Sequence, residues 1–423
     1  MRFSITAAVL SALAGSALGN SPGVSPASVN QDANPNSSFN IEKVVNTPEI
    51  PPKPDIVLLV DVTGSMSGAI ANVKANLVNV ISTVKASQPE AEFAVASFGD
   101  INDPNPFQVR QDLTADPGAL QAAVNTLSAS GGGDFPEDWI NALFKVSTGS
   151  VSFRPDSSRV VVLVGDAPSH DPSGGHTLAD AITALKAQNI RVLAVNVGQL
   201  DFSHQATEVT TATGGSIVPS DANSVSDAIL NGLKNLDVTV KPDVVSCDPG
   251  LTIAFAPTET TVPSGSATTF TETVNVTSDA AQGSTLHCSV RFLLNGVPGG
   301  DAFIQSVAIK VKDVTPPTAE CKDGPNPAGT TNPDNNANFW TLTSHDNVDP
   351  SVKILVRDSA SDAKFGPYEP GTNIKLVQAP GATPNVKAGS GAVKWQITVK
   401  GCAVLVVKDA AGNESTASCC ARP

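Results

Sequence analysis

The sequence predicts an α/β domain with a doubly wound, mainly parallel sheet, followed by two small all-β sandwich modules. Between residues 55 and 237, apolar stretches of strand length alternate with stretches whose apolar residues have helical spacing. After residue 238 the strands are short and alternating, and Pro, Gly and Ser clusters separate them. The length of 423 residues fits such a chain of several domains.

The first 54 residues contain two predicted segments. Residues 1–20 form a secretory signal, because Arg2 precedes a short apolar stretch and small residues near Gly19 and Asn20 suit cleavage. Residues 21–54 are rich in Ser, Pro and Asn and are expected to form a linker. No other long apolar run is present, so we expect a secreted, extracellular protein without a membrane span.

Residues 55–237 carry the alternating pattern of the α/β domain. Ile70, Val73 and Leu77 illustrate the helical spacing of its first helix. A later helix is expected to be capped near Thr114. The predicted strands are 55–61, 91–99, 159–166, 190–198 and 215–219, and the predicted helices are 68–87, one within 112–128, 177–189, 202–215 and 224–236. Ligands of such sheets bind beyond the carboxyl ends of the strands.

The β modules are expected at residues 238–313 and 314–423, and they hold all six cysteines. Six cysteines allow 15 pairings. Pairing within each module is simplest: Cys247 with Cys288, and Cys321 and Cys402 with the vicinal Cys419 and Cys420 in either order. The cysteines indicate an oxidising compartment. Three N-x-Ser/Thr sequons are possible glycan sites, at Asn36, Asn275 and Asn413.

The net charge is −14, with a pI near 4.7. The sequence has no Lys/Arg patch, so nucleic acid is not expected as a partner. An acidic surface suits solubility and the capture of cations.

Oxygen-bearing side chains follow the first predicted strand. Asp61, Thr63 and Ser65 occupy every second position of "DVTGS", and Asp166 ends a later strand. Hydroxyl and carboxylate oxygens suit a hard cation such as Mg²⁺, which keeps several of its waters. The alternative is that Asp61 and Ser65 only cap the first helix.

The stretch "DVTGSMSG" resembles the D-x-S/T-x-S pattern of the von Willebrand factor type A domain, also called the integrin I domain. The resemblance covers 55–237 and implies a metal-ion-dependent adhesion site that holds Mg²⁺ or Mn²⁺. It implies that Asp166 acts on the ion, often through water. The loop "SGGGDFPEDW" resembles the integrin β-subunit version, in which Glu137 would complete the main site.

The same resemblance implies a neighbouring site for Ca²⁺. Asp134 and Asp103 stand where that site has ligands, but Gly132 replaces an asparagine of the family pattern. Asp134 is equally explained as an ordinary turn residue. A third integrin β site is not expected, because Gly68 and Ala69 stand where it needs acidic residues.

Other polar residues leave alternatives open. His170 and His176 are either surface residues or a metal ligand or base near Asp166. The terminal module resembles immunoglobulin-like extracellular modules, including the hyaline-repeat type, through "DNVDPSV" and "KDAAGNES". Its Asp and Asn residues would either bind Ca²⁺ or form Asx turns: Asp346, Asn347, Asp349 and Asp409.

These observations predict a secreted, non-enzymatic adhesion protein. Its cation would recognise a carboxylate of an extracellular protein or matrix ligand. In the family, ligand binding is coupled to a shift of the last helix, here 224–236. The alternatives are a secreted metal-dependent hydrolase, in which Ser65 or a metal-bound water reacts, and a wall or matrix structural protein whose metal site is silent. No G-x-S-x-G, H-E-x-x-H or P-loop sequence supports the hydrolase.

Overall fold

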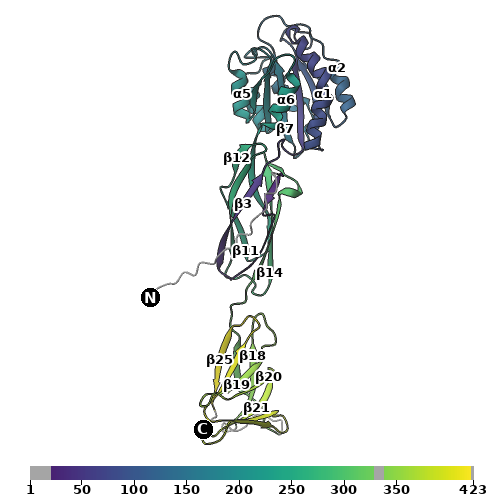
Figure 1. Cartoon of the computed structure of the whole chain (residues 1–423). Helices are drawn as coiled ribbons and strands as arrows, with labels where there is room; N and C mark the ends of the chain where they lie inside the picture. Colours follow the sequence, from purple (N-terminus) through teal and green to yellow (C-terminus); the bar gives the residue numbers. More distant parts are fainter. Residues whose placement is uncertain (1–20, 328–337, 421–423) are drawn as a thin grey trace.

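The computed structural model describes residues 21–327 and 338–420. Figure 1 shows three parts in a row: an α/β domain, a β-sandwich that follows it, and a second β-sandwich that ends near the C-terminus. The predicted fold class is confirmed. The signal predicted at 1–20 lies outside the described residues.

The α/β domain is built on a six-stranded sheet with the strand order β6-β5-β4-β7-β8-β9. Neighbouring strands are parallel except β5 and β6, which pair antiparallel. The central strand β4 is buried along its whole length because both faces of the sheet are covered. The strands are β4 (Pro54–Asp61), β5 (Glu92–Phe98), β6 (Phe107–Thr114), β7 (Ser158–Gly165), β8 (Ile190–Asn196) and β9 (Ser216–Pro219).

Three helices pack on each face of this sheet. One core contains Leu58 of β4 with side chains of α1, α2 and α6, and the other contains Leu59 with side chains of α3, α4 and α5. This alternation is the period of two expected of a strand. The helices are α1 (Ser67–Ser87), α2 (Pro117–Asn125), α3 (Trp139–Lys145), α4 (Leu178–Ala187), α5 (Gln205–Thr213) and α6 (Val225–Lys234).

The segment from Phe107 to Thr114 differs from the prediction. It forms the edge strand β6, and Thr114 is its last residue rather than a helix cap. The helix α2 begins two residues after Ala115, and its N-cap is Asp116, whose carboxylate accepts a hydrogen bond from the Gly118 backbone N–H. Pro117 at the first helical position fits this start.

The stretch predicted as a linker, 21–54, was misassigned: it forms three strands. They are β1 (Gly23–Ser25), β2 (Ser28–Ala33) and β3 (Ser37–Asn46), and β3 pairs with ten residues of β13 (Ala267–Val276). Along β3, more buried residues alternate with more exposed ones, which fits a strand with one buried face. The remaining strands of the first sandwich are β10 (Asp237–Cys247), β11 (Leu251–Ala256), β12 (Thr260–Pro263), β14 (Thr285–Leu294), β15 (Val297–Pro298) and β16 (Ile304–Val311).

The α/β domain is therefore inserted into this sandwich. The chain leaves the sandwich after β3, forms the domain, and re-enters at β10. The two sheets of the sandwich have the orders β1-β3-β13-β11 and β12-β10-β14-β16-β2, so both contain strands from before and after the insertion.

The core of the first sandwich holds a buried charged group. Lys43 and Glu272 are both 0% exposed, and Lys43 Nζ lies 3.3 Å from Glu272 Oε2. Lys43 Nζ also donates to the Pro26 carbonyl, and Gln305 Nε2 donates to both oxygens of Glu272. Burial lowers the pKa of Lys43, and the Glu272 carboxylate opposes that shift. These bonds compensate two charges that would otherwise be costly to bury.

The second sandwich consists of a five-stranded sheet, β17-β18-β21-β23-β22, and a four-stranded sheet, β20-β19-β24-β25. Its strands are β17 (Thr318–Asp323), β18 (Phe339–His345), β19 (Ile354–Asp358), β20 (Lys364–Tyr368), β21 (Thr372–Gln378), β22 (Asn385–Ala388), β23 (Trp395–Val399), β24 (Ala403–Lys408) and β25 (Glu414–Cys419).

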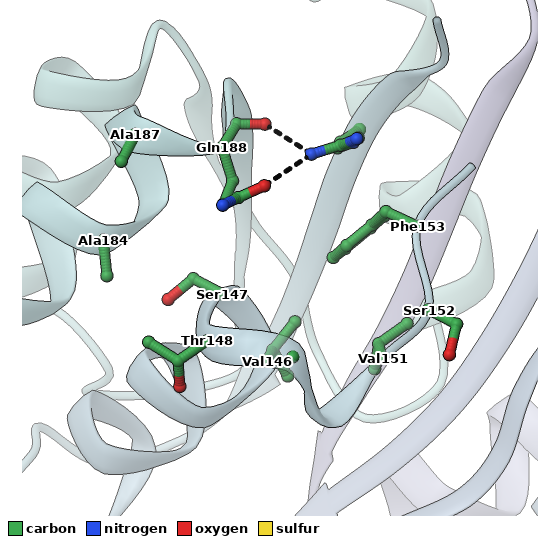
Figure 2. A pocket seen from close by; sticks show the side chains of 11 residues that line it. Val146, Ser147, Thr148, Val151, Ser152, Phe153, Ala184, Ala187 and Gln188 are labelled. Carbon is green, nitrogen blue, oxygen red and sulfur yellow. Dashed lines mark hydrogen bonds between the residues drawn. The ribbon is translucent and has the colours of Figure 1, made fainter. Parts of the chain in front are cut away.

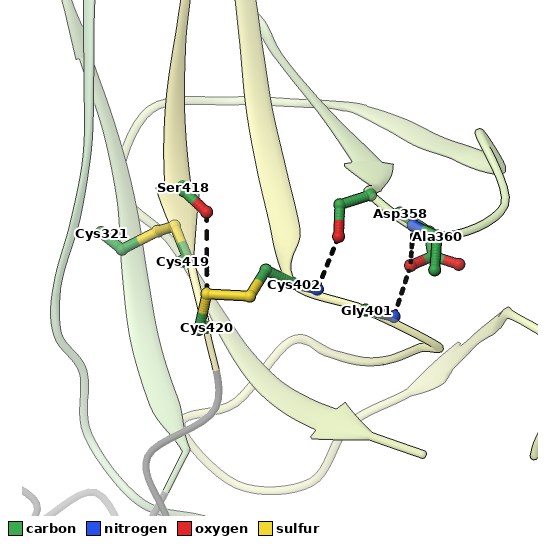
Figure 3. The surroundings of a disulfide bond; sticks show 9 residues. Cys321, Asp358, Ala360, Gly401, Cys402, Ser418, Cys419 and Cys420 are labelled. Atoms are coloured by element: carbon green, nitrogen blue, oxygen red, sulfur yellow. Dashed lines mark hydrogen bonds between the residues drawn. A yellow bond between two sulfur atoms is a disulfide. The ribbon is translucent and has the colours of Figure 1, made fainter. Parts of the chain in front are cut away.

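Three disulfides confirm pairing within each module. Cys247 pairs with Cys288 in the first sandwich. In the second, Cys321 of β17 pairs with Cys419 of β25, and Cys402 pairs with Cys420 (Figure 3). The first of these two bonds joins the two sheets of the module.

No helix in 21–327 or 338–420 is long and apolar enough to cross a membrane. Of the sequons, Asn36 lies exposed in the turn between β2 and β3. The side chain of Asn413 is hydrogen-bonded to Asp409 and to the Asp313 carbonyl, so a glycan there would displace both bonds.

Candidate metal site

The loop after β4 brings a carboxylate and two hydroxyls together. Asp61, the last residue of β4, is 0% exposed, and its Oδ1 accepts from the backbone N–H and the hydroxyl of Thr63, both at 2.8 Å. A 3-10 turn (Gly64–Met66) then leads into α1. The local pattern combines an Asx turn with the start of a helix.

The two hydroxyls of this loop have the spacing of neighbouring metal ligands. Thr63 Oγ1 and Ser65 Oγ are 3.4 Å apart. Adjacent ligands of an octahedral ion at about 2.1 Å are about 3 Å apart. Because Thr63 donates its hydroxyl hydrogen to Asp61, the lone pairs of its oxygen remain available for a cation. Ser65 is exposed, so this side of the loop is open to solvent.

A second loop, before α3, brings Glu137 to the same end of the sheet. Its backbone N–H donates to the Pro168 carbonyl at 2.8 Å, and its carbonyl accepts from His170 N–H at 2.9 Å. The next residue, Asp138, donates to the Gly99 carbonyl at 3.0 Å. Glu137 is therefore fixed between the segments that follow β5 and β7, and only 4% of it is exposed.

The carboxylates of Asp61 and Glu137 each have an oxygen without a partner. Asp61 Oδ2 and Glu137 Oε2 are buried and accept no hydrogen bond from any described residue. Burial raises the pKa of Asp61 to about 7, and nearby Asp166 adds to the shift while the Thr63 bonds oppose it. Burial likewise raises the pKa of Glu137 to about 8, followed by repulsion from Asp61 and Asp100. A cation would remove both the repulsion and the unmet hydrogen-bonding need.

Asp166 lies directly after β7 and is half-buried. After burial, its charge adds to the raised pKa values of Asp61 and Glu137, so the three carboxylates lie within range of one another's charges. Its carbonyl accepts from Gln199 N–H at 2.8 Å, so the loop after β8 holds it in place. The three loops named by the sequence thus meet at one edge of the sheet.

Gly132 lies close to both Thr63 and Glu137, and its missing side chain leaves room for a cation. A Cβ at this position would lie 3.3 Å from the Thr63 Cβ and 3.6 Å from Glu137 Oε1. Its φ of +83° also favours glycine. A glycine here therefore keeps a space open between Thr63 and Glu137.

Asp103 and Asp134, which were predicted for a neighbouring site, make different contacts. Asp103 Oδ2 accepts from the backbone N–H groups of Asp100 and Gly132, at 3.0 and 3.4 Å, and so ties two loops together. Asp134 is exposed, and its Oδ1 is 3.4 Å from His170 Nε2.

The sequence analysis missed Asp100. It follows β5 at the same sheet edge and is 0% exposed. His170 Nε2 lies 3.3 Å from its Oδ1, and Asp100, Asp134 and His170 form a group whose ligand atoms are within 4.8 Å of one another. The available signal was its position just beyond the buried strand β5, comparable to that of Asp61 at the end of β4. His176 instead stacks on Phe144, with ring centroids 3.7 Å apart.

An aromatic pair stands beside these loops. Phe135 and Phe202 are 46% and 69% exposed, and their rings meet edge to face with centroids 5.6 Å apart. Phe135 lies two residues before Glu137, and Phe202 lies in the loop between β8 and α5. Exposed aromatic rings are frequent anchors of protein interfaces.

A pocket lies at the opposite end of the sheet, near the amino end of β7. Val146, Phe153 and Gln188 are among its lining residues, and Arg159, near the amino end of β7, donates to the carbonyl and side-chain oxygens of Gln188 (Figure 2). This pocket is far along β7 from Asp166 and shares no residue with the predicted site.

Comparison with known proteins supports the assignment of the α/β domain. Residues 55–232 match the family model of the von Willebrand factor type A domain. Over 133 residues the chain is 29% identical to the alpha-protein kinase vwkA of Dictyostelium discoideum, a match that covers 30% of this chain and 20% of the kinase. The chain thus spans about a fifth of the length of this curated relative.

Two solved structures are similar at low sequence identity. A von Willebrand factor type A protein from Catenulispora acidiphila has a TM-score of 0.36 at 14% identity, covering 71% of this chain and 76% of that one. The VWA domain of SpRpn10 has a TM-score of 0.33 at 15% identity, covering 43% and 94%. Neither score adds to the fold assignment. With the observed strand order and the family match, residues 55–232 form a von Willebrand factor type A domain.

Proposed function

We propose that this protein binds an extracellular protein or matrix ligand through a divalent cation held by its type A domain. Thr63, Ser65 and Glu137 would hold the ion, and Asp61 and Asp166 would act on it through hydrogen bonds and water. The observation that carries the proposal is the pair of buried carboxylate oxygens without partners beside two suitably spaced hydroxyls. When bound, Mg²⁺ or Mn²⁺ would offer an open position to a carboxylate of the ligand.

The exposed pair Phe135 and Phe202 would supply apolar contact beside this position. A charged contact gives orientation, and buried aromatic contact supplies much of the affinity of a typical interface. The match to the kinase covers only 20% of that protein, so we do not extend kinase activity to this chain. We propose a binding role without catalysis, because His170 pairs with Asp100 and Asp134 rather than with Ser65.

We also propose that the protein is secreted. The support is the three disulfides, which pair every cysteine of the chain. Disulfides of this kind persist in oxidising compartments. Antibody detection of the protein in the culture medium and on the surface of intact cells tests this location.

The experiment begins with the metal. Mn²⁺ is titrated into the full-length protein and counted by electron paramagnetic resonance, with Asp61→Ala as the test variant and Asp301→Ala, an exposed aspartate in the first sandwich, as the matched control. We expect a high-affinity Mn²⁺ that is lost in Asp61→Ala and kept in Asp301→Ala. Equal Mn²⁺ binding by all three proteins would refute the site.

The ligand is tested next, with immobilised protein and a panel of purified extracellular matrix proteins. We expect capture in Mg²⁺ and its loss in EDTA, in Asp61→Ala, and in part in Phe202→Ala. Capture that persists in EDTA would favour the structural-protein alternative. Turnover of a substrate that Ser65→Ala abolishes would favour the hydrolase.

A further inference from the structure

The connector between the two β-sandwiches, residues 312–317, is fixed to both of them. On the side of the first sandwich, Gln282 Oε1 accepts from the Val314 backbone N–H at 2.8 Å, and Gln282 Nε2 donates to Thr315 Oγ1 at 2.8 Å. On the side of the second, Asn413 Nδ2 donates to the Asp313 carbonyl at 3.2 Å. The junction is thus an ordered contact between modules.

Three carboxylates meet at this junction from three separate segments. Asp313 belongs to the connector, Asp346 follows β18, and Asp409 follows β24. One oxygen of each lies within 4.8 Å of the others. Two oxygens bound to one Ca²⁺ at about 2.4 Å are at most about 4.8 Å apart, so the three fit around one such ion.

Asp346 has a buried oxygen that nothing satisfies. The residue is 7% exposed, and its Oδ1 accepts from the backbone N–H groups of Val348 and Asp349, at 2.9 and 2.8 Å. Its Oδ2 is buried and has no partner among the described residues. Asx turns therefore account for one oxygen of Asp346 and leave the other unexplained, at a cost that a cation would remove.

The charges of the group are uncompensated. Asp409 is 6% exposed, and among the described residues its carboxylate accepts only from the backbone and side chain of Asn413. In the part of the chain that the structure describes, no Lys, Arg or His side chain lies within 4.0 Å of the three carboxylates. Burial and the neighbouring Asp346, Asp409 and Asp349 raise the pKa of Asp313, as expected for close like charges.

We propose that Asp313, Asp346 and Asp409 bind one Ca²⁺ that fastens the two β-sandwiches to each other. The ligands are hard carboxylate oxygens, which Ca²⁺ prefers. Ca²⁺ accepts six to eight oxygens in flexible geometry, which suits ligands from a connector and two loops, whereas Mg²⁺ requires a near-ideal octahedron. The site lies at the end of the first sandwich away from the type A domain, so it is independent of the function proposed above.

Ca²⁺ binding is measured by isothermal titration calorimetry on full-length Asp61→Ala, which removes the proposed site in the type A domain. We expect one Ca²⁺ per chain, and at least a tenfold loss of affinity when Asp346→Asn or Asp313→Asn is added. Asp301→Asn, with the same change of charge, is the matched control and should bind as before. Circular dichroism confirms folding, and Asp313→Asn, on the connector, does not alter either sandwich core.

The consequence for the junction is measured by limited proteolysis of the connector. Ca²⁺ should protect residues 312–317 in Asp61→Ala and not after Asp346→Asn or Asp313→Asn is added. The proposal is overturned if Asp61→Ala takes up no Ca²⁺ at 10 mM, which is about ten times the upper end of the range of about 10⁻⁴–10⁻³ M for weak extracellular sites. It is also overturned if both junction variants bind normally. Binding without protection of the connector would overturn the fastening role, and equal affinity for Mg²⁺ would overturn the assignment to Ca²⁺.

Discussion

Mg²⁺ binding at the type A domain should strengthen steeply with pH. Without metal, the pKa values of Asp61 and Glu137 are raised to about 7 and about 8. At pH 7, about half of Asp61 and about nine-tenths of Glu137 would be protonated, whereas at pH 9 both would be almost fully ionised. Because the cation competes with these protons, its affinity should rise about 20-fold between pH 7 and pH 9.

Isothermal titration calorimetry on the full-length protein, in two buffers of different ionisation enthalpy, measures both affinity and proton release. About 1.4 protons should leave per Mg²⁺ at pH 7, and about 0.1 at pH 9. In Glu137→Gln only Asp61 still titrates, so the change in affinity should shrink to about twofold. An affinity independent of pH, or an unchanged dependence in Glu137→Gln, would show that these carboxylates do not lie at the cation.

The same shifts affect the stability of the metal-free domain. Both folded pKa values lie above their ordinary values of 3.8 and 4.5. The stabilisation from holding these protons is therefore complete below about pH 4 and is lost as the pH rises through 7 and 8. The difference in melting temperature between Mg²⁺ and EDTA should accordingly be larger at pH 9 than at pH 6.

Three further predictions concern packing and coupling. Gly132→Ala should strain the backbone by about 1 kcal/mol and weaken Mg²⁺ binding in calorimetry, because the new methyl group enters the space beside Thr63. Lys43→Ala should lower the free energy of unfolding in urea by about 3–5 kcal/mol, because it leaves Glu272 charged and buried; a loss below 1 kcal/mol would contradict this. A disulfide from Gly68→Cys and Ala222→Cys, whose Cβ positions are 3.0 Å apart, should fix the segment before α6 to α1. If α6 moves on binding, as in the resembling family, oxidation should change ligand affinity and dithiothreitol should restore it.

The sequence predicted the type A domain well because its signals are local. Strands such as β4 are apolar without interruption, and helices such as α1 keep their spacing over many residues. Asp61 and Asp166 could be found because one ends such a strand and the other directly follows one. Asp100 follows β5 in the same way, but the resemblance directed attention to Asp103, which instead binds the backbone of neighbouring loops.

The insertion was not predictable in the same way. Strands β2 and β3 precede the domain, while their partners β16 and β13 lie more than 200 residues further along the chain. Pairing over that separation depends on tertiary contacts, which local composition does not report. The Pro and Ser content of 21–54 therefore suggested a linker. Asp346 and Asp409 were candidates from the sequence, but Asp313, on the connector, joined them only when the folded junction brought the three carboxylates together.

The strand order of the first sandwich determines how it would carry tension. A pull between a ligand on the type A domain and the terminal module enters the sandwich at two points, Asn46 at the end of β3 and Asp237 at the start of β10, and leaves at Val311. Part of this load therefore runs from β10 to β16. β14 lies between these two strands and pairs antiparallel with both. The hydrogen bonds of such ladders run perpendicular to the strands. The load would therefore shear two whole ladders at once instead of unzipping one bond at a time, as suits a mechanically strong tether.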